Sequence, residues 1–216
     1  MKTTITLGLT LVTACGTAFA GPVYDISPGE FYDGLTGITN MDLSELRGSI
    51  VFDEYQDFSI GGMDGPLYEG TFLTRLVRSN ETNNLTFNFR FMNDNTDLSG
   101  QIKHIEITGF SDYQARVEYR AEAGPDFLDT KSVARSVDGD MLSFNFYEDG
   151  NPDHASKFFF AMLDTEEYDF SASSPVATIY LFSGESVTVD LVTSIPTPGS
   201  LALLGAAGVL ASRRRR

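Results

Sequence analysis

The sequence predicts an all-β fold, a β-sandwich or jelly roll of about nine antiparallel strands. Three observations support this prediction. Apolar and polar residues alternate with a period of two along several segments. Turn-forming pairs such as Asp-Gly separate these segments. The 216-residue chain also contains 17 phenylalanines and nine tyrosines, which provide ample side chains for a core between two sheets.

The clearest alternation runs over 85–91, where Leu85, Phe87, Phe89 and Phe91 share one face. The segments 113–120, 142–146 and 187–191 alternate in the same way, and further strands are expected at 50–52, 71–77, 103–108, 158–163 and 176–182. Turns are expected at 61–66, 138–139, 149–152 and 183–184, and one helical turn at 42–47. Strands with one apolar face each pack most simply as two sheets. No internal repeat is evident, which argues against a propeller or solenoid.

The N-terminal segment 1–20 has the features of a cleavable signal peptide. One positive charge, Lys2, precedes the apolar stretch 5–12, and the segment ends in small residues at Ala18 and Ala20. This ending predicts that signal peptidase cleaves after Ala20, so the protein is expected to be exported. Cys15 ends a lipobox-like sequence, and a lipidated Cys15 is the alternative.

The C-terminal segment 196–216 has three parts. Its proline motif is Pro196, Thr197, Pro198 and Gly199, its apolar stretch includes Leu201, Leu203, Leu204, Val209 and Leu210, and it ends in Arg213, Arg214, Arg215 and Arg216. The 14 residues 199–212 would form a helix of about 21 Å, short of a ~30 Å hydrocarbon core unless flanking residues extend it. The four arginines are expected to stay in the cytoplasm, so the helix anchors the chain transiently in the membrane.

This three-part tail resembles the PEP-CTERM sorting signal of exported bacterial surface proteins. The resemblance implies that an exosortase-like membrane protease cleaves at the proline motif. It also implies that the released protein reaches the cell surface or matrix, where extracellular polysaccharide is a possible partner. Thr197 stands where the name-giving motif has glutamate, so the tail resembles a Pro-Thr-Pro-Gly variant. An ordinary tail anchor or a buried terminal helix is the alternative.

The body between these segments, residues 21–195, is expected to form one domain. Lys2 and the four terminal arginines account for five of the 15 basic residues, and neither terminal segment contains an acidic one. The body therefore has 30 acidic and ten basic residues, a net charge of −20. Such a surface repels nucleic acid and anionic lipid, which are not expected as partners. The only cysteine is Cys15, so the body forms no disulfide.

No pattern of catalytic residues stands out, and a non-enzymatic protein is predicted. A Gly-x-Ser-x-Gly elbow and a phosphate-binding glycine loop are both absent from the sequence. The two histidines, His104 and His154, are too few for a typical zinc hydrolase, and His104 is expected at a solvated strand position. A glycoside hydrolase needs two facing carboxylates, and nothing selects a pair among 30.

Two features suggest binding instead. Asp149, Asn151 and Asp153 concentrate oxygen ligands in one loop, as Asp138 and Asp140 do in another, so calcium is a candidate cofactor. The same residues are typical of tight turns, which is the favoured interpretation. Tyr113, Tyr119 and Tyr147 are candidates for stacking on sugars, although the first two lie on the apolar face of their strand and are expected in the core.

These observations predict an exported, non-enzymatic protein of the cell surface or extracellular matrix. A calcium- or carbohydrate-binding module of the matrix is the main alternative, and a secreted glycoside hydrolase is a second one. The sequence does not select a ligand, a matrix partner or an oligomeric state.

Overall fold

The structure is a computed structural model that describes residues 23–123, 127–147, 155–170 and 174–191. In this part of the chain it contains twelve strands and two short 3₁₀ helices. The strands are β1 (Tyr24–Ile26), β2 (Phe31–Asp33), β3 (Gly48–Gly62), β4 (Gly65–Ser79), β5 (Leu85–Asn93), β6 (Ile102–Ile107), β7 (Ala115–Tyr119), β8 (Thr130–Arg135), β9 (Leu142–Phe146), β10 (Phe159–Leu163), β11 (Val176–Leu181) and β12 (Ser186–Asp190), and the helices are η1 (Ser44–Leu46) and η2 (Ala121–Ala123).

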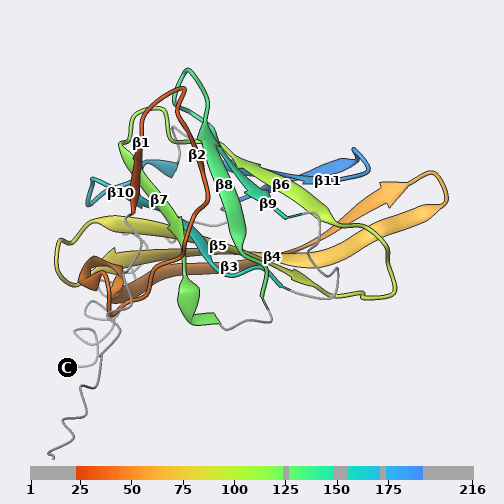
Figure 1. The fold of residues 1–216 in the computed structure, drawn as a ribbon, viewed down its shortest axis with the longest axis horizontal. Coiled ribbons are helices and arrows are strands. Elements are labelled where there is room, and N and C mark those ends of the chain that lie inside the picture. The colour runs from red at the N-terminus through yellow and green to blue at the C-terminus, as the bar shows by residue number, and fades with distance from the viewer. Residues whose placement is uncertain (1–22, 124–126, 148–154, 171–173, 192–216) are drawn as a thin grey trace, which may run out of the picture.

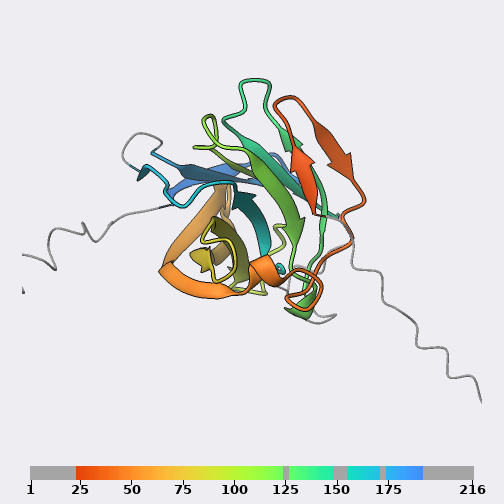
Figure 2. The ribbon, with the colours of Figure 1, turned by 90° about the vertical axis from the view of Figure 1, so that its left-hand side faces the viewer.

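The strands form two six-stranded antiparallel sheets, which confirms the predicted β-sandwich. Sheet A has the order β1-β7-β10-β5-β4-β3, and sheet B has the order β12-β11-β6-β9-β8-β2. Figure 1 shows β3, β4 and β5 below β6, β9 and β11, and Figure 2 shows the two layers from the side. Strand β10 lies between β5 and β7, so segments distant in sequence become neighbours in sheet A.

All nine predicted strand segments lie on strands, but the predicted number of about nine is wrong. Three strands, β1, β2 and β8, were not predicted. The first two have only three residues each, too few to show a period. In β8, Val133 is the only large apolar side chain, so the alternation is weak. The helical turn expected at 42–47 is η1.

The core lies between the sheets and consists largely of phenylalanines. Phe159 of sheet A is fully buried, and its ring centroid lies 5.7 Å from that of Phe89 in the same sheet. Across the sandwich, its ring lies 4.9 Å from Phe144 and 5.5 Å from Phe146. Tilted and edge-on ring pairs at these distances add to the stabilisation from burial alone. Aromatic contacts therefore join the two sheets where β10 crosses the core.

A second buried feature is the guanidinium of Arg135, at the end of β8. Its side chain is 5% exposed and donates hydrogen bonds to four backbone carbonyls, those of Gly139, Ile26, Phe110 and Tyr113, at 2.7–2.9 Å. The predicted turn at 138–139 is present, and the φ of +80° at Gly139 explains the glycine there. Arg135 thus joins this turn to β1 and to the segment before β7.

The predicted targeting segments lie outside the described residues. This holds for signal peptide 1–20, with Ala18, Ala20 and Cys15, and for tail 196–216, with its proline motif, apolar stretch and arginines. Within the described part of the chain, no helix is long and apolar enough to cross a membrane. Strand β1 begins at Tyr24 and β12 ends at Asp190, so the two sheets fall within the predicted domain 21–195.

Candidate functional site

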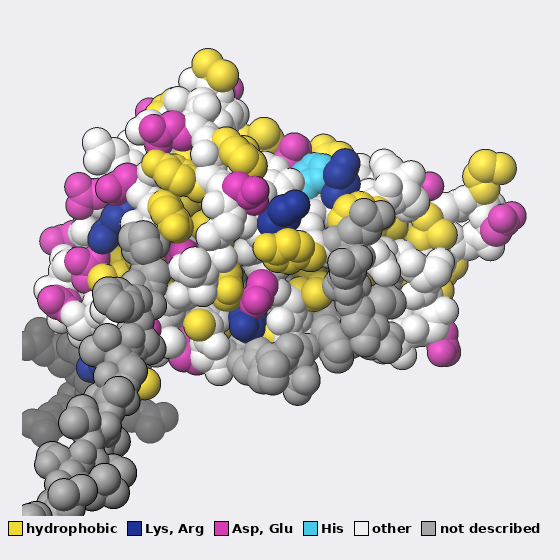
Figure 3. Space-filling view, viewed as in Figure 1, with side chains coloured by type: hydrophobic (Ala, Val, Ile, Leu, Met, Phe, Trp, Pro, Cys, Tyr) yellow, Lys and Arg dark blue, Asp and Glu magenta, His cyan; other side chains and the backbone are white. Residues whose placement is uncertain are grey.

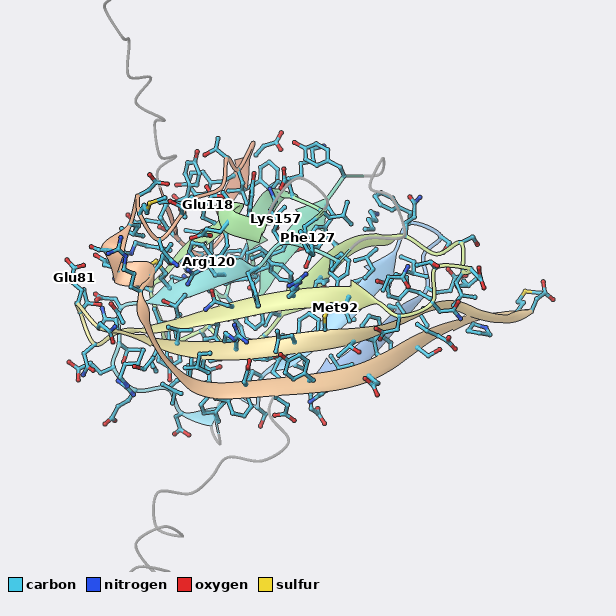
Figure 4. All side chains as sticks on the ribbon, turned by 90° about the horizontal axis from the view of Figure 1, so that it is seen from below. Glu81, Met92, Glu118, Arg120, Phe127 and Lys157 are labelled. Carbon is cyan, nitrogen blue, oxygen red and sulfur yellow. The ribbon has the colours of Figure 1, made fainter. Side chains whose placement is uncertain are left out.

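A groove lies on the outer face of sheet A, the face turned away from the core. This sheet A groove encloses about 600 Å³, within the ~300–1,000 Å³ usual for ligand sites. Its polar lining includes four arginines and three asparagines: Arg47, Arg75, Arg90, Arg120, Asn40, Asn80 and Asn88. Apolar contacts come from Phe158, Ile50, Val77 and Leu46. In Figure 4, which views the molecule from below, β3, β4 and β5 cross the picture and Arg120 lies beyond β5.

The register of the strands brings these side chains together. Arg75 of β4 lies opposite Asn88 of β5, and Leu73 lies opposite Arg90. Because side chains alternate between the faces of a strand, the buried phenylalanines of β5 point inward and Asn88 and Arg90 point outward. The amide of Arg120 donates to the carbonyl of Phe158 at 2.7 Å, which places the end of β7 beside the start of β10.

The groove is locally basic, although the protein as a whole is acidic. Four of the ten basic residues of the body line it, whereas Glu122 is its only acidic lining residue among those described. Elsewhere acidic side chains dominate, and Figure 3 shows them spread over the face it views. The net charge of −20 alone argued against anionic partners, but that average conceals this local concentration of guanidinium groups. Small anionic groups are therefore suitable ligands for this part of the surface.

Two of the groove arginines are held by other groups of the protein. Arg75 forms a bidentate ion pair with Asp53, with Nε–Oδ1 and Nη2–Oδ2 distances of 3.0 and 2.8 Å. Arg120 donates through Nε to Asn88 Oδ1 at 3.2 Å, through Nη2 to the carbonyl of Leu46 at 3.0 Å, and through Nη1 to Asn40 Oδ1. Arg120 therefore ties the segment before β3 to the floor of the groove.

Arg90 differs from both. Its guanidinium carbon lies 4.5 Å from the ring centroid of Phe127 and 5.6 Å from that of Phe158. Its Nε is buried, and no described residue accepts a hydrogen bond from it. Figure 4 shows Phe127 beyond β5, on the same side as Arg120. The side chain that projects from the groove floor is thus held by ring contacts, and its terminal amino groups are paired with no described residue.

One wall of the groove is the segment between β2 and β3. Ile38 and Leu46 from this segment pack on Phe160 and Met162 of β10 and form a small second core. Beneath the segment, Glu118 is fully buried, although its alternation with Tyr119 suggested an outward, polar position. Its Oε1 accepts from the amides of Gly37 at 3.2 Å and Tyr119 at 3.0 Å, whereas no described residue donates to its Oε2.

Replacing Glu118 with glutamine is expected to stabilise the protein by about 1 kcal/mol at pH 7–8, since glutamine can still accept from the amides of Gly37 and Tyr119 but buries no charge. Burial raises the pKa of Glu118, and the amides of Tyr119 and Gly37 oppose this effect only in part. A raised pKa favours the folded state at low pH, and this contribution is lost as the pH rises through the folded-state pKa. The advantage of the variant should therefore shrink towards pH 4. Urea unfolding at several pH values tests this, and an advantage independent of pH would contradict it.

Comparison of the chain with known protein families, with characterised proteins and with solved structures found no match.

Of the candidate calcium ligands, the structure describes only Asp138 and Asp140. Asp149, Asn151 and Asp153 lie outside the described residues. Asp138 accepts hydrogen bonds within its own turn, from Ser136 Oγ at 2.5 Å and from the amide of Asp140 at 3.1 Å. Among the residues that the structure describes, no group of three His, Cys, Asp or Glu side chains is placed to hold a metal ion.

The three candidate tyrosines do not form an exposed row. Tyr119 is 5% exposed and Tyr113 packs against the main core, as their positions on an apolar strand face predicted. Tyr147 is 49% exposed, but the other two are not available beside it. The aromatic rings next to the groove are instead Phe158 and Phe127. Phe158 directly precedes β10, whose five residues are all apolar and all buried, so no alternation in the sequence could have identified it.

His104 faces outward from sheet B, opposite the isoleucines, as its strand position indicated. It is less solvated than expected, because its side chain is only 17% exposed and stacks on Tyr180 with centroids 4.4 Å apart. Burial lowers the pKa of His104, and Glu106, 3.7 Å from its Nε2, opposes the shift. The side chain is therefore expected to be neutral at pH 7. It lies on the opposite sheet from the groove.

The chemistry of the groove suits binding more than hydrolysis. A glycoside hydrolase places two carboxyl groups ~5–9.5 Å apart around the scissile bond. The described lining offers a single carboxylate, Glu122, whose Oε1 already accepts from the amide of Asn40 at 2.5 Å. Asp53, beside the groove, is occupied by Arg75. What the lining provides in quantity are N–H donors from guanidinium and amide groups, which bind hydroxyl and acidic groups without reacting with them.

Proposed function

We propose that this is an exported, non-enzymatic protein of the cell surface or extracellular matrix, and that its β-sandwich holds a glycan chain in the sheet A groove. The observation that supports this most is the combination of four arginines, three asparagines and Phe158 in one open groove. Sugars offer many hydroxyl groups and one apolar ring face. Amide and guanidinium donors beside an aromatic ring are complementary to both.

The proposed route to the surface uses the two terminal segments. Signal peptidase removes 1–20, the apolar tail holds the chain in the membrane, and an exosortase-like protease then cleaves near Pro198. This route ends at the cell surface or matrix, where the resemblance of the tail to the PEP-CTERM signal makes extracellular polysaccharide a possible partner. Destination and groove chemistry thus agree on a glycan. No metal or other cofactor is part of this proposal.

The test measures binding of the exported protein to extracellular polysaccharide from its own cells, by affinity electrophoresis or calorimetry. Ile50→Glu places a carboxylate among the groove donors and is expected to weaken binding about tenfold, or ~1.4 kcal/mol. Val51→Glu is the matched control, because Ile50 and Val51 are neighbours in β3, are 55% and 53% exposed, and only Ile50 lines the groove.

Equal binding by the two variants would place the glycan elsewhere on the protein, and no binding by the unaltered protein would refute the glycan function. The intact mass of the recovered protein tests the sorting route separately. Loss of both 1–20 and the residues after about Pro198 is expected. A chain that retains Arg213 to Arg216 in every cell fraction would contradict exosortase processing and indicate a plain tail anchor, and a lipidated Cys15 would place the anchor at the other end.

A further inference from the structure

Arg90 is the groove arginine whose hydrogen-bonding capacity is least used. Arg75 is paired with Asp53, Arg120 donates to three groups, and Arg47 donates through Nε to the carbonyl of Asn40 at 2.9 Å. For Arg90, no hydrogen bond or ion pair is found with any residue in the described ranges, and its Nε is buried. A guanidinium has five N–H donors and no acceptor. Arg90 is half-buried at the open groove, so its terminal amino groups can donate to solvent or to a ligand.

The surroundings of Arg90 make this unsatisfied state unfavourable in the ligand-free protein. Burial lowers the pKa of its guanidinium, Tyr55 opposes this shift, and the like charge of Arg75 adds to it. A partly desolvated charge without an ionic partner contributes less to stability than one paired with an anion. Arg90 therefore stabilises the protein little, and a different role explains its presence on the groove floor.

The rings around Arg90 leave its donors free. The guanidinium carbon lies over the rings of Phe127 and Phe158, at 4.5 and 5.6 Å from their centroids. Such contacts use the flat faces of a guanidinium, whereas its N–H groups point outward in the plane. The two phenylalanines thus restrict the side chain without occupying its donors. A planar acceptor with two oxygens, a carboxylate, matches this fork of donors in a bidentate pair.

We propose that Arg90 binds a carboxylate of the glycan, so that the ligand of the sheet A groove is a chain containing uronic acid residues. This proposal rests on the glycan-binding function proposed above and adds the chemical class of the sugar. Arg90 is the residue that determines specificity. Arg75 and Arg120, which other groups of the protein hold, shape the groove around it.

The charge around the groove also limits how many carboxylates the chain carries. Glu122 lines the groove, Asp53 and Asp57 lie on the adjacent β3, and the body has a net charge of −20. At physiological salt, charges act over a Debye length of ~8 Å, so an anion beyond the groove is repelled by the surrounding acidic surface. A glycan in which neutral sugars separate the uronic acids avoids this repulsion. A densely sulfated or fully uronic polymer does not.

The test compares three probes by calorimetry with the exported protein. The probes are the extracellular polysaccharide of its own cells, the same polysaccharide after reduction of its carboxyl groups to alcohols, and heparin as a densely charged polyanion. We expect the unaltered protein to bind the native polysaccharide at least about tenfold more tightly than the reduced form, the effect of one charge-assisted hydrogen-bonded pair. Heparin is expected to bind more weakly than the native polysaccharide.

Arg90→Gln should abolish the difference between native and reduced polysaccharide, while Lys103→Gln should keep it. Lys103 is the matched control because it is exposed on sheet B and its replacement removes the same charge. Urea unfolding supplies a second measurement that does not depend on ligand. Arg90→Gln should be about as stable as the unaltered protein, since it removes a half-buried charge that forms no ion pair with a described residue.

Each contrary outcome identifies what fails. Equal binding of native and reduced polysaccharide refutes the carboxylate and leaves the glycan function standing. If heparin binds more tightly than the native polysaccharide, a glycan with widely spaced uronic acids is refuted as the ligand. An Arg90→Gln variant that keeps its preference for the native form refutes the role of Arg90. Absence of binding to every probe overturns both proposals.

Discussion

Replacing Arg135 with methionine is expected to lower the free energy of unfolding by about 3 kcal/mol, since hydrogen bonds to charged groups contribute ~1.5–3 kcal/mol and buried unsatisfied carbonyls are unfavourable. Arg135 is 5% exposed and donates to four carbonyls. These carbonyls belong to the turn before β9, to β1 and to the segment that precedes β7. Methionine has a similar length but donates to none of them, so all four would lose a donor at once.

Urea unfolding gives the measurement for Arg135→Met, and Lys131→Met in the same strand provides the control. Lys131 is exposed and contacts Tyr147 through its ammonium group, 5.5 Å from the ring centroid. Its loss is expected to change stability by less than about 0.5 kcal/mol, as is usual for surface positions. Equal midpoints for the two variants would show that solvent satisfies the carbonyls as well as Arg135 does, and would contradict its structural role.

Replacing Arg120 with methionine is the second change with a large expected effect. We expect a loss of about 2 kcal/mol, because the buried Asn88 Oδ1 and the carbonyl of Leu46 lose their charged donor. The variant should also weaken polysaccharide binding, since Arg120 holds the wall of the groove through Asn40 and Leu46. Urea unfolding and calorimetry check these two effects on the same samples.

Arg116→Met is the matched control for Arg120, because the two arginines alternate onto the same outer face of β7, one near each end of the strand. Arg116 forms an ion pair with Glu45, and the two side chains are 34% and 24% exposed. Pairs near the surface contribute ~0–1 kcal/mol, so this variant should differ little from the unaltered protein. If both substitutions are equally mild, Arg120 does not hold the wall. If Arg120→Met loses less stability than expected but still loses binding, Arg120 contributes to ligand binding and not to the stability of the fold.

The opposite pattern is expected for Arg90, and this contrast separates structure from function in the groove. Arg120 should stabilise the fold, whereas Arg90 should not, although both lie on the same face and both carry a guanidinium. The difference arises from their partners, which are Asn88, Asn40 and Leu46 for Arg120 and two phenylalanine rings for Arg90. Sites that bind ligands commonly retain such unfavourable groups until the ligand arrives.

The sequence predicted the fold class because the evidence for it is local. In β5, the alternation of Phe87 and Phe89 with Asn88 and Arg90 correctly separates the core face from the outer face. The same holds for Tyr119 and Arg120 at the end of β7. The short strands β1 and β2 carry no such periodicity, and their pairing depends on contacts with β7 and β8 that are distant in sequence.

The candidate site could not be predicted, because it depends on the order of strands within the sheet. Arg90 and Arg120 share a groove because β10 lies between β5 and β7, an arrangement that no local pattern specifies. Glu118 is a second example of an effect that no local pattern specifies. The alternation of polar and apolar residues in β7 places it on the polar outer face, whereas the distant segment that contains Ile38 and Leu46 covers and buries it. The net charge of the body, −20, likewise gives no indication of the arginines that gather in the groove.

Hydrogen exchange of the exported protein, with and without polysaccharide from its own cells, tests the central claim most directly. Exchange reports where backbone amides become protected on binding. We expect protection in the segments that border the groove, residues 39–50 and 120–123, and little change in β6, β9 and β11 on the outer face of sheet B. Protection confined to sheet B, or none at saturating polysaccharide, would contradict the assignment of the sheet A groove as the glycan site.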